Sequence, residues 1–421
     1  MNFTSDQKYK LLLEIAQKTR DTLDLDEIMV HLLDTIQTIV HYDAGGIFVL
    51  NQDIIEDTQI PPANVIAGVH WRGYAPPDGY KDDMFRQGKG LIGTVIHSGK
   101  SLVVPDVRLD ERYIQGRKET LSEIAVPIHI SDRAVGALNL ESDKLNAYDQ
   151  DDLEVLQFFA DAAGIALEKA MLHRQILEKE LLDKQLQMAR DVQMHLLPLE
   201  DPAIPGYDIA GVCIPTEKIG GDYYDYMRLS PKMMGIAVAD VSGHGIAPAL
   251  AMTAFRSLLR SHAKGEIDPA AMAEQLNHLL PEFTGGSHFI TLCYGELHTE
   301  TDEITFVSCG HPSPRLIHLD GRREALLANG PALGIFGEAD YFNESKFLSY
   351  GDILILYTDG VVEIENHNGD PFGVERLMTL VSQYRHLPAK ALLQKVINET
   401  KSFSGSQTYL DDFTLVIVKK E

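Results

Sequence analysis

Apolar positions along the chain predict two helical segments within residues 8–41, followed by strands. The apolar residues of the second helical segment share one face. Asp24 and Glu27, just before that face, have the spacing of an N-terminal capping box. The strands are predicted at residues 46–50, 65–71, 122–128 and 134–140, and a further helix begins at Asp149.

The helical pattern continues through residues 165–197 without a Gly or Pro to break it. Its second half has coiled-coil spacing, with Gln193 at the one polar seam position. The earlier apolar residues fall out of phase with that spacing near Lys179. The two sets are Ile165, Leu172 and Ile176, then Leu182, Leu186, Ala189 and Leu196. Two interpretations stay open: one amphipathic helix packed on its own domain, or a dimeric linker whose phase slip allows two packings.

Pro198 ends this helix, and the rest of the chain alternates apolar strands with two pairs of helices. Strands are predicted near residues 208–214, 223–228, 233–240, 289–298, 303–308, 315–319, 352–358 and 413–418. Helices are predicted near residues 246–263, 269–283, 374–384 and 389–402. At 421 residues the chain is long enough for two or three domains, and the pattern indicates an α+β multidomain protein.

Four short motifs in the second half place aspartates beside apolar strands. They are Gly-Gly-Asp-Tyr-Tyr-Asp (220–225), Ala-Asp-Val-Ser-Gly-His-Gly (239–245), Tyr-Thr-Asp-Gly (357–360) and Asp-Asp-Phe-Thr (411–414). A single aspartate at a strand end is most often structural, since Asp is common in turns and helix caps. Four that converge would repel one another unless cations neutralise them. Oxygen ligands favour Mg²⁺ or Mn²⁺, and a pair of such ions can activate water for attack on phosphorus.

Composition narrows the class of protein. A formal charge of −25 argues against nucleic-acid binding and against an anionic membrane surface. No apolar run is long enough to span a bilayer, and the N-terminus lacks a signal peptide's apolar core. The three cysteines (Cys213, Cys293 and Cys309) lie in apolar stretches without zinc spacing. We therefore expect buried, reduced thiols in a cytoplasmic protein.

The four motifs, in this order, resemble the bacterial SpoIIE/RsbU branch of the PPM metal-dependent Ser/Thr protein phosphatases. Further matches are Gly-His-Pro (310–312), Gly-Pro-Ala-Leu-Gly (330–334) and Phe-Gly-Val-Glu-Arg-Leu (372–377). The resemblance covers roughly residues 186–421 and implies two antiparallel sheets sandwiched between helices. It also implies two Mn²⁺ or Mg²⁺ ions and hydrolysis without a phosphoenzyme.

The resemblance assigns a role to each candidate residue. It implies that Asp240 bridges both metals and that the carbonyl of Val241 is a further ligand. Asp359 and Asp411 would hold the first metal, and Asp222 the second. Asp225, through water, and Asp412 would lie outside the set of direct ligands and support it. His244 is a candidate general acid or a turn cap, and Lys218 is a candidate phosphate contact or an ordinary surface lysine.

The N-terminal half resembles a GAF domain, a small-molecule sensor fold with a central antiparallel sheet and flanking helices. The matching segments are Gly-Leu-Ile-Gly (90–93), Val-Pro-Asp-Val (104–107) with Asp-Glu-Arg-Tyr (110–113), and Val-Gly-Ala-Leu-Asn-Leu (135–140). This half has no cysteine, which argues against a thiol-attached bilin, and the ligand is unknown. Five aromatic residues could line a pocket, although an aromatic residue in a small domain is more often part of the core. They are Trp71, Tyr74, Tyr80, Phe85 and Tyr113.

We therefore expect a GAF domain (1–170), a helical coiled-coil linker (171–198) and a PPM phosphatase domain (199–421). By resemblance the substrate is a phosphoserine or phosphothreonine on a STAS-type anti-anti-sigma factor, and the protein is a homodimer through the linker helix and GAF domain. An inactive scaffold that binds the regulator is the alternative. A diguanylate cyclase is rejected, because Gly-Gly-Asp is followed here by Tyr-Tyr-Asp and not by the Glu-Phe of that signature. A histidine-kinase-like ATPase is also rejected, because the spacing of its Gly-rich loop differs by one residue from the spacing here.

Overall fold

The computed structural model describes residues 24–50, 66–74, 88–265, 267–327 and 330–421. The chain folds as two compact units, Met1–Leu181 and Leu182–Glu421. The first predicted helical segment, before residue 24, lies outside the described residues.

A five-stranded antiparallel sheet forms the centre of the first unit, with strand order β2-β1-β5-β4-β3. The strands are β1 (Ala44–Leu50), β2 (Ile66–Arg72), β3 (Leu102–Val104), β4 (Ser122–Ile130) and β5 (Arg133–Ser142). The predicted strands are thus confirmed, and the apolar runs of β1, β4 and β5 are buried in the middle of the sheet.

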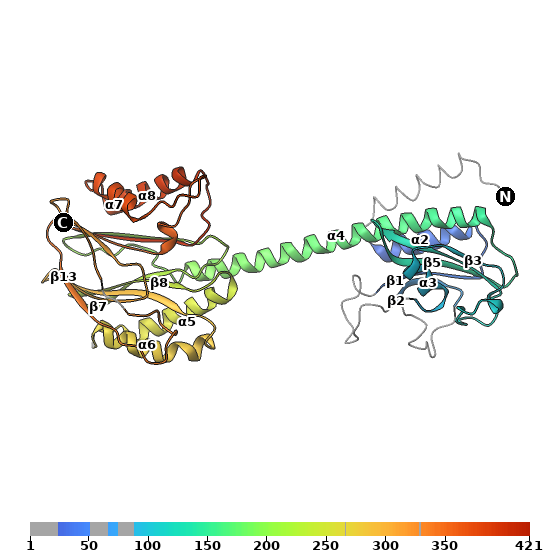
Figure 1. The fold of residues 1–421 in the computed structure, drawn as a ribbon, viewed down its shortest axis with the longest axis horizontal. Coiled ribbons are helices and arrows are strands. Elements are labelled where there is room, and N and C mark those ends of the chain that lie inside the picture. The colour runs from blue at the N-terminus through green and yellow to red at the C-terminus, as the bar shows by residue number, and fades with distance from the viewer. Residues whose placement is uncertain (1–23, 51–65, 75–87, 266, 328–329) are drawn as a thin grey trace. The chain divides into compact units, whose positions relative to one another are not determined.

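Helices cover both faces of this sheet (Figure 1). Helix α2 (Leu25–Gln37) and the start of α4 (Gln150–Met194) pack on one face, where Leu32 and Phe159 are buried. Helix α3 (Gly90–Ser98) packs on the other, and a short turn, η1 (Val107–Leu109), follows β3. Asp24 caps α2 as predicted, because its carboxylate accepts hydrogen bonds from the backbone N–H groups of Asp26 and Glu27.

Two five-stranded antiparallel sheets form the centre of the second unit, and their orders are β13-β10-β9-β8-β7 and β12-β11-β14-β15-β6. The first sheet contains β7 (Tyr223–Ser230), β8 (Met233–Val241), β9 (Ile290–His298), β10 (Glu303–Cys309) and β13 (Glu344–Phe347). The second contains β6 (Tyr207–Ile214), β11 (Arg315–Ile317), β12 (Arg323–Ala325), β14 (Ile353–Tyr357) and β15 (Phe413–Lys420). Only the edge strands β12 and β13 were not predicted, because their short sequences contain few apolar residues.

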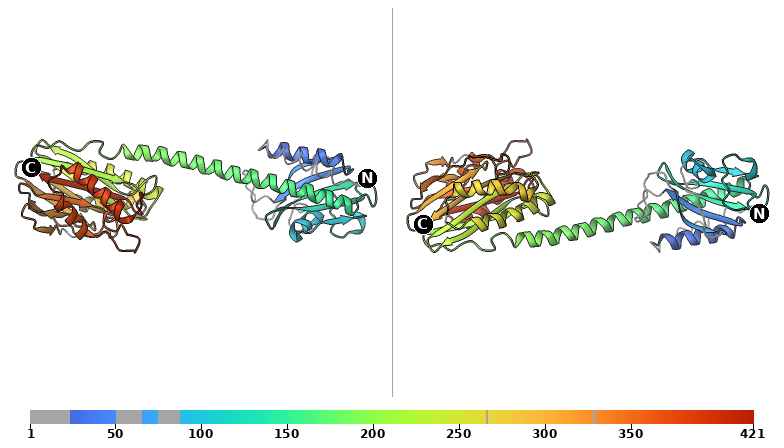
Figure 2. Two further views of the ribbon diagram at one scale, coloured as in Figure 1. Left: turned by 90° about the horizontal axis from the view of Figure 1, so that it is seen from above. Right: turned by 90° about the horizontal axis from the view of Figure 1, so that it is seen from below.

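One pair of helices covers the outer face of each sheet. Helices α5 (Ile246–His262) and α6 (Pro269–Thr284) contact the first sheet. Helices α7 (Val374–Gln383) and α8 (Ala389–Ser404) contact the second. Figure 2 shows α7 and α8 in front in its left view and α5 and α6 in front in its right view. This layering confirms the predicted two-sheet sandwich between helices.

Helix α4 is one continuous helix of 45 residues. Its apolar residues Ile165, Leu172, Ile176 and Leu182 are all more than half exposed in the single chain. Gln193, predicted at a polar seam position, is instead buried against the second unit's own backbone, at Gly220. The coiled coil, and a linker bounded by residues 171 and 198, stay predictions.

No helix in the described ranges is both long enough and apolar enough to cross a membrane. Cys213, Cys293 and Cys309 are free thiols and buried. Burial raises the pKa of each of these thiols, so none is a reactive thiolate.

Candidate metal centre

The predicted metal-binding aspartates lie at one end of the two sheets of the second unit. Asp222 precedes β7 and Asp240 lies at the end of β8, and these antiparallel strands pair Tyr223 with Ala239. Asp359 opens the 3₁₀ turn η2 (Asp359–Val361) after β14, and Asp411 lies two residues before β15. Antiparallel pairing brings the end of one strand to the start of its neighbour, so each sheet contributes two aspartates to this end.

Hydrogen bonds join the two sheets here. The Thr358 hydroxyl, between β14 and η2, donates to Asp222 Oδ2 at 2.8 Å. Asp412 Oδ1 accepts from Thr216 N and Asp412 Oδ2 from Gly221 N, both at 2.8 Å. The Asp412 carboxylate therefore fixes the loop that carries Asp222, which suits a supporting role better than a ligand role.

Two glycines allow the backbones to approach closely. A Cβ atom on Gly221 would lie 2.8 Å from the carbonyl oxygen of Val241, and one on Gly360 would lie 2.0 Å from that of Asp412. Any side chain at these positions would push the strand ends apart. The backbone is thus packed tightly at the end of the sandwich where the four aspartates lie.

Electrostatics at this end of the sandwich favour a cation. Burial, with the charges of Asp359 and Asp411 adding to it, raises the pKa of Asp240 to about 7. Burial, and next the charge of Asp240, raises the pKa of Asp222 well above its usual range. The pKa of Asp359 is raised by burial and by Asp411. Each of these three carboxylates thus resists ionisation because it is buried and has acidic neighbours, and a divalent cation would relieve that cost.

The donor set fits Mn²⁺ or Mg²⁺, because the carboxylates and the Val241 carbonyl supply only hard oxygens. Even so, no three His, Cys, Asp or Glu side chains converge tightly enough to ligate one ion in the part of the chain that the structure describes. The Asp359 carboxylate accepts instead from Gly360 N at 2.9 Å, and that of Asp411 from Asp412 N at 2.8 Å. Mutual repulsion explains why like charges bind nearby N–H groups instead of converging, so ligation requires these side chains to turn.

Comparison with known proteins decides the family. The model of the Stage II sporulation protein E (SpoIIE) family matches residues 230–421, and that of the GAF domain matches residues 22–168. The chain is a GAF domain joined to a SpoIIE-type PP2C phosphatase domain.

Curated relatives point the same way. Phosphoserine phosphatase RsbU of Bacillus subtilis is 28% identical over 243 residues, covering 57% of this chain and 71% of RsbU. Phosphoserine phosphatase RsbP of the same organism is 26% identical over 244 residues, covering 56% of this chain and 58% of RsbP. The solved SiaA-PP2C domain of Pseudomonas aeruginosa has a TM-score of 0.52 at 21% identity and covers 58% of this chain and 99% of its own. That structure supports the fold of the phosphatase domain.

His244 and Lys218 of the phosphatase domain have different acidic neighbours. His244, 70% exposed between two glycines of positive φ, places Nδ1 4.0 Å from Asp411 Oδ1. The Lys218 ammonium lies 2.7 Å from a carboxylate oxygen of Asp183 on α4. The histidine is therefore accessible to a phosphorylated substrate, whereas Lys218 could contact phosphate only if its ion pair with Asp183 opened.

Asp225 has other partners than the predicted metal. Its carboxylate is fully buried and receives two hydrogen bonds from the Arg260 guanidinium, at 2.6 and 2.7 Å, and one from the Tyr223 hydroxyl. Tyr223 and Asp225 are hydrogen-bonded on one face of β7, whereas Asp222 lies just before the strand and accepts a hydrogen bond from Thr358. The structure gives no support to a contact between Asp225 and a metal, through water or otherwise, and we leave it out of the proposed centre.

Proposed function

We propose that this protein is a metal-dependent phosphoserine/phosphothreonine protein phosphatase controlled by its GAF domain. The observation that carries the proposal is that Asp222, Asp240, Asp359 and Asp411 all lie at one end of a PP2C-type sandwich, where burial and acidic neighbours raise the pKa of Asp222, Asp240 and Asp359. The names of the relatives RsbU and RsbP support phosphoserine as the reacting group.

Each residue would have one task. Asp240, with the Val241 carbonyl, would face both ions, Asp359 and Asp411 would hold the first, and Asp222 the second. When bound, the pair of ions lowers the pKa of water and neutralises the phosphate oxygens. Thr358 orients the carboxylate of Asp222 through their 2.8 Å hydrogen bond. His244, exposed beside Asp411, is the residue that we assign to donating a proton to the leaving serine oxygen.

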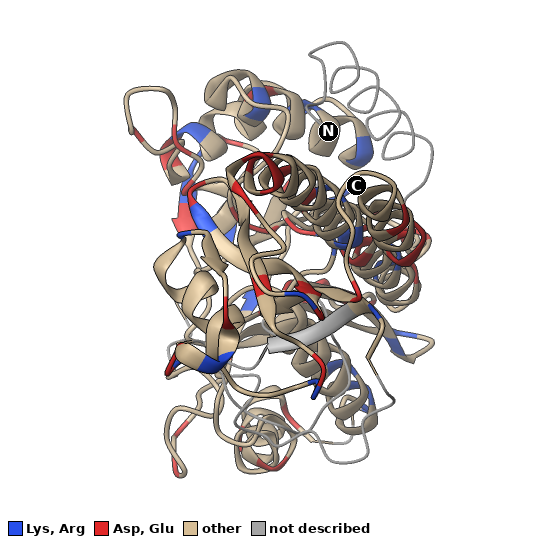
Figure 3. Cartoon of the chain, turned by 90° about the vertical axis from the view of Figure 1, so that its right-hand side faces the viewer, with Lys and Arg blue, Asp and Glu red and all other residues tan. Residues whose placement is uncertain are grey.

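We further propose that the substrate is a phosphorylated STAS-type regulator, in keeping with the resemblance to partner-switching phosphatases. An acidic protein needs a local cation for a phosphorylated partner, and the metal pair would supply it. In the view of Figure 3 the Lys and Arg segments are spread over separate elements among acidic ones.

The long helix supports a homodimer as the working form. Ile165, Leu172 and Ile176 lie on one face of α4 and expose 64%, 54% and 55% of their surface. Large apolar side chains exposed in series along a helix are typical of a surface that a second copy covers. We propose that two copies pair through α4, in the reducing compartment that the three free thiols suit.

Hydrolysis of p-nitrophenyl phosphate and of a phosphoserine STAS protein, with Mn²⁺ and with EDTA, tests the proposal. We expect release of phosphate with Mn²⁺ and none with EDTA. An inactive scaffold would bind the STAS protein but release no phosphate under either condition.

A further inference from the structure

The sheet of the GAF domain contains two buried glutamates that face each other. Glu123 on β4 pairs directly with Glu141 on β5, and only 3% and 5% of their surfaces are exposed. Like charges directly opposite in an antiparallel pair destabilise a sheet, and a buried carboxylate is costly without a charge partner. Burial raises the pKa of both, and each carboxylate affects the ionisation of the other.

Neutral groups are the only direct partners of these two carboxylates within the described residues. Glu141 accepts from the Tyr74 hydroxyl at 2.7 Å and from the Thr120 hydroxyl. Glu123 accepts from Asn139 Nδ2 at 3.2 Å. Arg117 lies near enough to affect Glu141, but its guanidinium pairs with Asp143.

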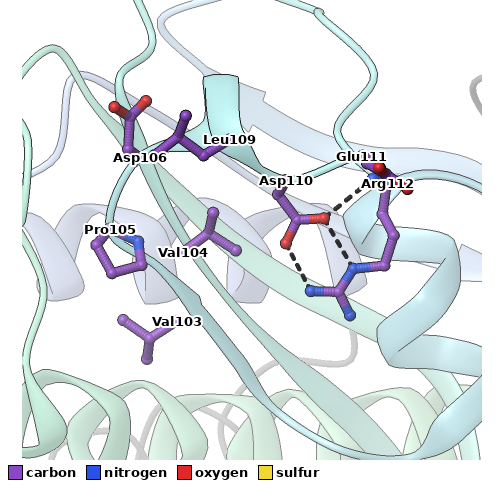
Figure 4. Close-up of a pocket in the computed structure, with 8 residues that line it drawn as sticks. All are labelled: Val103, Val104, Pro105, Asp106, Leu109, Asp110, Glu111 and Arg112. Atoms are coloured by element: carbon purple, nitrogen blue, oxygen red, sulfur yellow. Dashed lines mark hydrogen bonds and ion pairs between the residues drawn. The ribbon is translucent and has the colours of Figure 1, made fainter.

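The neighbouring groove shows how this domain treats its other acidic groups. A groove of about 590 Å³ runs beside β3, and Asp106 and Asp110 line it (Figure 4). Each of these aspartates binds an arginine two residues later, Arg108 or Arg112, through two side-chain hydrogen bonds. The groove's aspartates thus carry their own counter-charges, whereas the glutamate pair does not.

An unsatisfied acceptor lies in the glutamate cluster. Asn139 is wholly buried, and its Nδ2 donates to both Glu123 and the Tyr74 hydroxyl, each at 3.2 Å. Its Oδ1 has no hydrogen-bond partner. The Tyr113 hydroxyl, whose pKa is raised by burial and by both glutamates, is a second buried polar atom without a hydrogen-bond partner. Buried polar groups are normally satisfied, so among the described residues the cluster lacks a hydrogen-bond donor for Asn139 Oδ1.

We propose that the GAF domain binds a small organic ligand through an ammonium group, held by the carboxylates of Glu123 and Glu141 and the Oδ1 atom of Asn139. An ammonium offers three donors and no acceptor, which matches two carboxyl groups and one unused carbonyl. The rings of Tyr74 and Tyr113 can add cation–π attraction. Of the other predicted pocket aromatics, Trp71 is 42% exposed, and Tyr80 and Phe85 lie outside the described residues.

A metal ion fits this cluster less well than an ammonium. Ca²⁺ takes about six to eight oxygen ligands, and Mg²⁺ keeps several waters in a near-ideal octahedron. Among the described residues only two carboxylates are present in this buried cluster, and the hydroxyls of Tyr74 and Thr120 direct their hydrogens at Glu141. The ligand would therefore be an amine or an amino acid, a class of signal that is independent of the phosphatase chemistry.

Thermal melting of the full-length protein tests this site. The fluorescence of Trp71, the chain's single tryptophan, which lies on β2 of the GAF domain, reports the melting. The probes are methylammonium and tetramethylammonium chloride at equal concentration, which share a charge but differ in N–H donors. We expect methylammonium to raise the melting temperature more than tetramethylammonium does. Free L-amino acids should likewise raise it more than their N-acetyl derivatives.

Glu123→Gln should remove the preference for methylammonium, and Glu111→Gln, at an exposed position in the groove, should keep it. Where an amino acid binds, Glu123→Gln should weaken it about tenfold or more, because a charge-assisted hydrogen bond is lost. If Glu123→Gln does not fold, Glu141→Gln serves in its place. Equal effects of the two salts, an unchanged preference in the glutamine variants, or stabilisation by Ca²⁺ instead would each overturn the proposal.

Discussion

The side-chain amide of Gln193 forms two hydrogen bonds with the backbone of Gly220. Nε2 donates to the Gly220 carbonyl at 2.8 Å, and Oε1 accepts from the Gly220 N–H at 3.1 Å. Gln193 lies near the end of α4, and Gly220 lies two residues before Asp222. The long helix is therefore joined directly to the loop that carries a proposed metal ligand.

Gln193→Ala should raise the Mn²⁺ concentration needed for half-maximal activity about tenfold. The substitution leaves the two buried polar groups of Gly220 unsatisfied, at about 1–3 kcal/mol each, and frees the loop. Calorimetric titration with Mn²⁺ should show the same loss of affinity without any substrate. Gln187→Ala is the matched control, because Gln187 is exposed on the same helix and bonds only to Asp191. If both variants needed the same Mn²⁺ concentration for half-maximal activity, the hydrogen bonds between Gln193 and Gly220 would have no role in metal binding.

Asp240→Asn should abolish turnover and leave folding nearly intact. The change removes one of several crowded negative charges, so it relieves repulsion while it removes the ligand proposed to face both ions. Asp359→Asn and Asp411→Asn should behave alike. The measurement is phosphate release in saturating Mn²⁺, with circular dichroism as the folding control. Activity above about a tenth of wild type in Asp240→Asn would contradict the assignment, because a lost bridging ligand should cost far more.

The raised pKa of Asp240 predicts a pH-dependent stability of the metal-free protein. Its pKa is about 7 in the folded chain, against an ordinary value of 3.8. Between these values the unfolded carboxyl loses its proton while the folded one keeps it, so stability falls as pH rises from about 4 to about 7. In EDTA, Asp240→Asn should therefore melt at a higher temperature than wild type at pH 8 and at a similar temperature near pH 4. If calorimetry gave the same difference in melting temperature between Asp240→Asn and wild type at pH 8 and at pH 4, the prediction would be wrong.

The ion pair of Asp225 with Arg260 predicts a structural effect without a metal effect. Asp225 is fully buried, so Arg260→Met should destabilise the phosphatase domain by about 3 kcal/mol by leaving that carboxylate unpaired. The Mn²⁺ affinity of the remaining folded protein should be that of wild type. Denaturant unfolding and Mn²⁺ titration measure the two quantities. A lowered Mn²⁺ affinity at unchanged stability would restore Asp225 to the metal centre.

The sequence predicted the sandwich well and the side-chain partners less well. Strands such as β8 and β14 were recognisable because their apolar runs are buried on both faces. The hydrogen bonds of Gln193 to Gly220 could not be foreseen from the sequence. A glutamine that packs on its own domain and one at a coiled-coil seam occupy the same position in the apolar repeat of a helix. The arginine that pairs with Asp225 comes from α5 and follows from tertiary packing alone.

The length and phase of α4 should set the activity of the phosphatase domain. One unbroken helix, Gln150–Met194, starts in the GAF unit and ends beside Gly220, so a rotation or repacking of it can reach Asp222. Such coupling needs a two-state element that both ends bias. Inserting four residues after Lys179, where the apolar pattern slips, turns the following helix by about 40° and lengthens it by about 6 Å.

We expect this insertion to change basal activity while each unit stays folded. Insertions of one to seven residues should give activities that vary with the helical period, because the face presented to the second copy rotates with each residue. Sedimentation measures the dimer, and phosphatase assays measure the coupling. Replacing the exposed Leu172 and Ile176 with Gln should weaken the dimer, whereas Glu180→Gln, at an exposed polar position on the same helix, should not. A monomeric protein whose activity is indifferent to all seven insertions would show that α4 is only a tether.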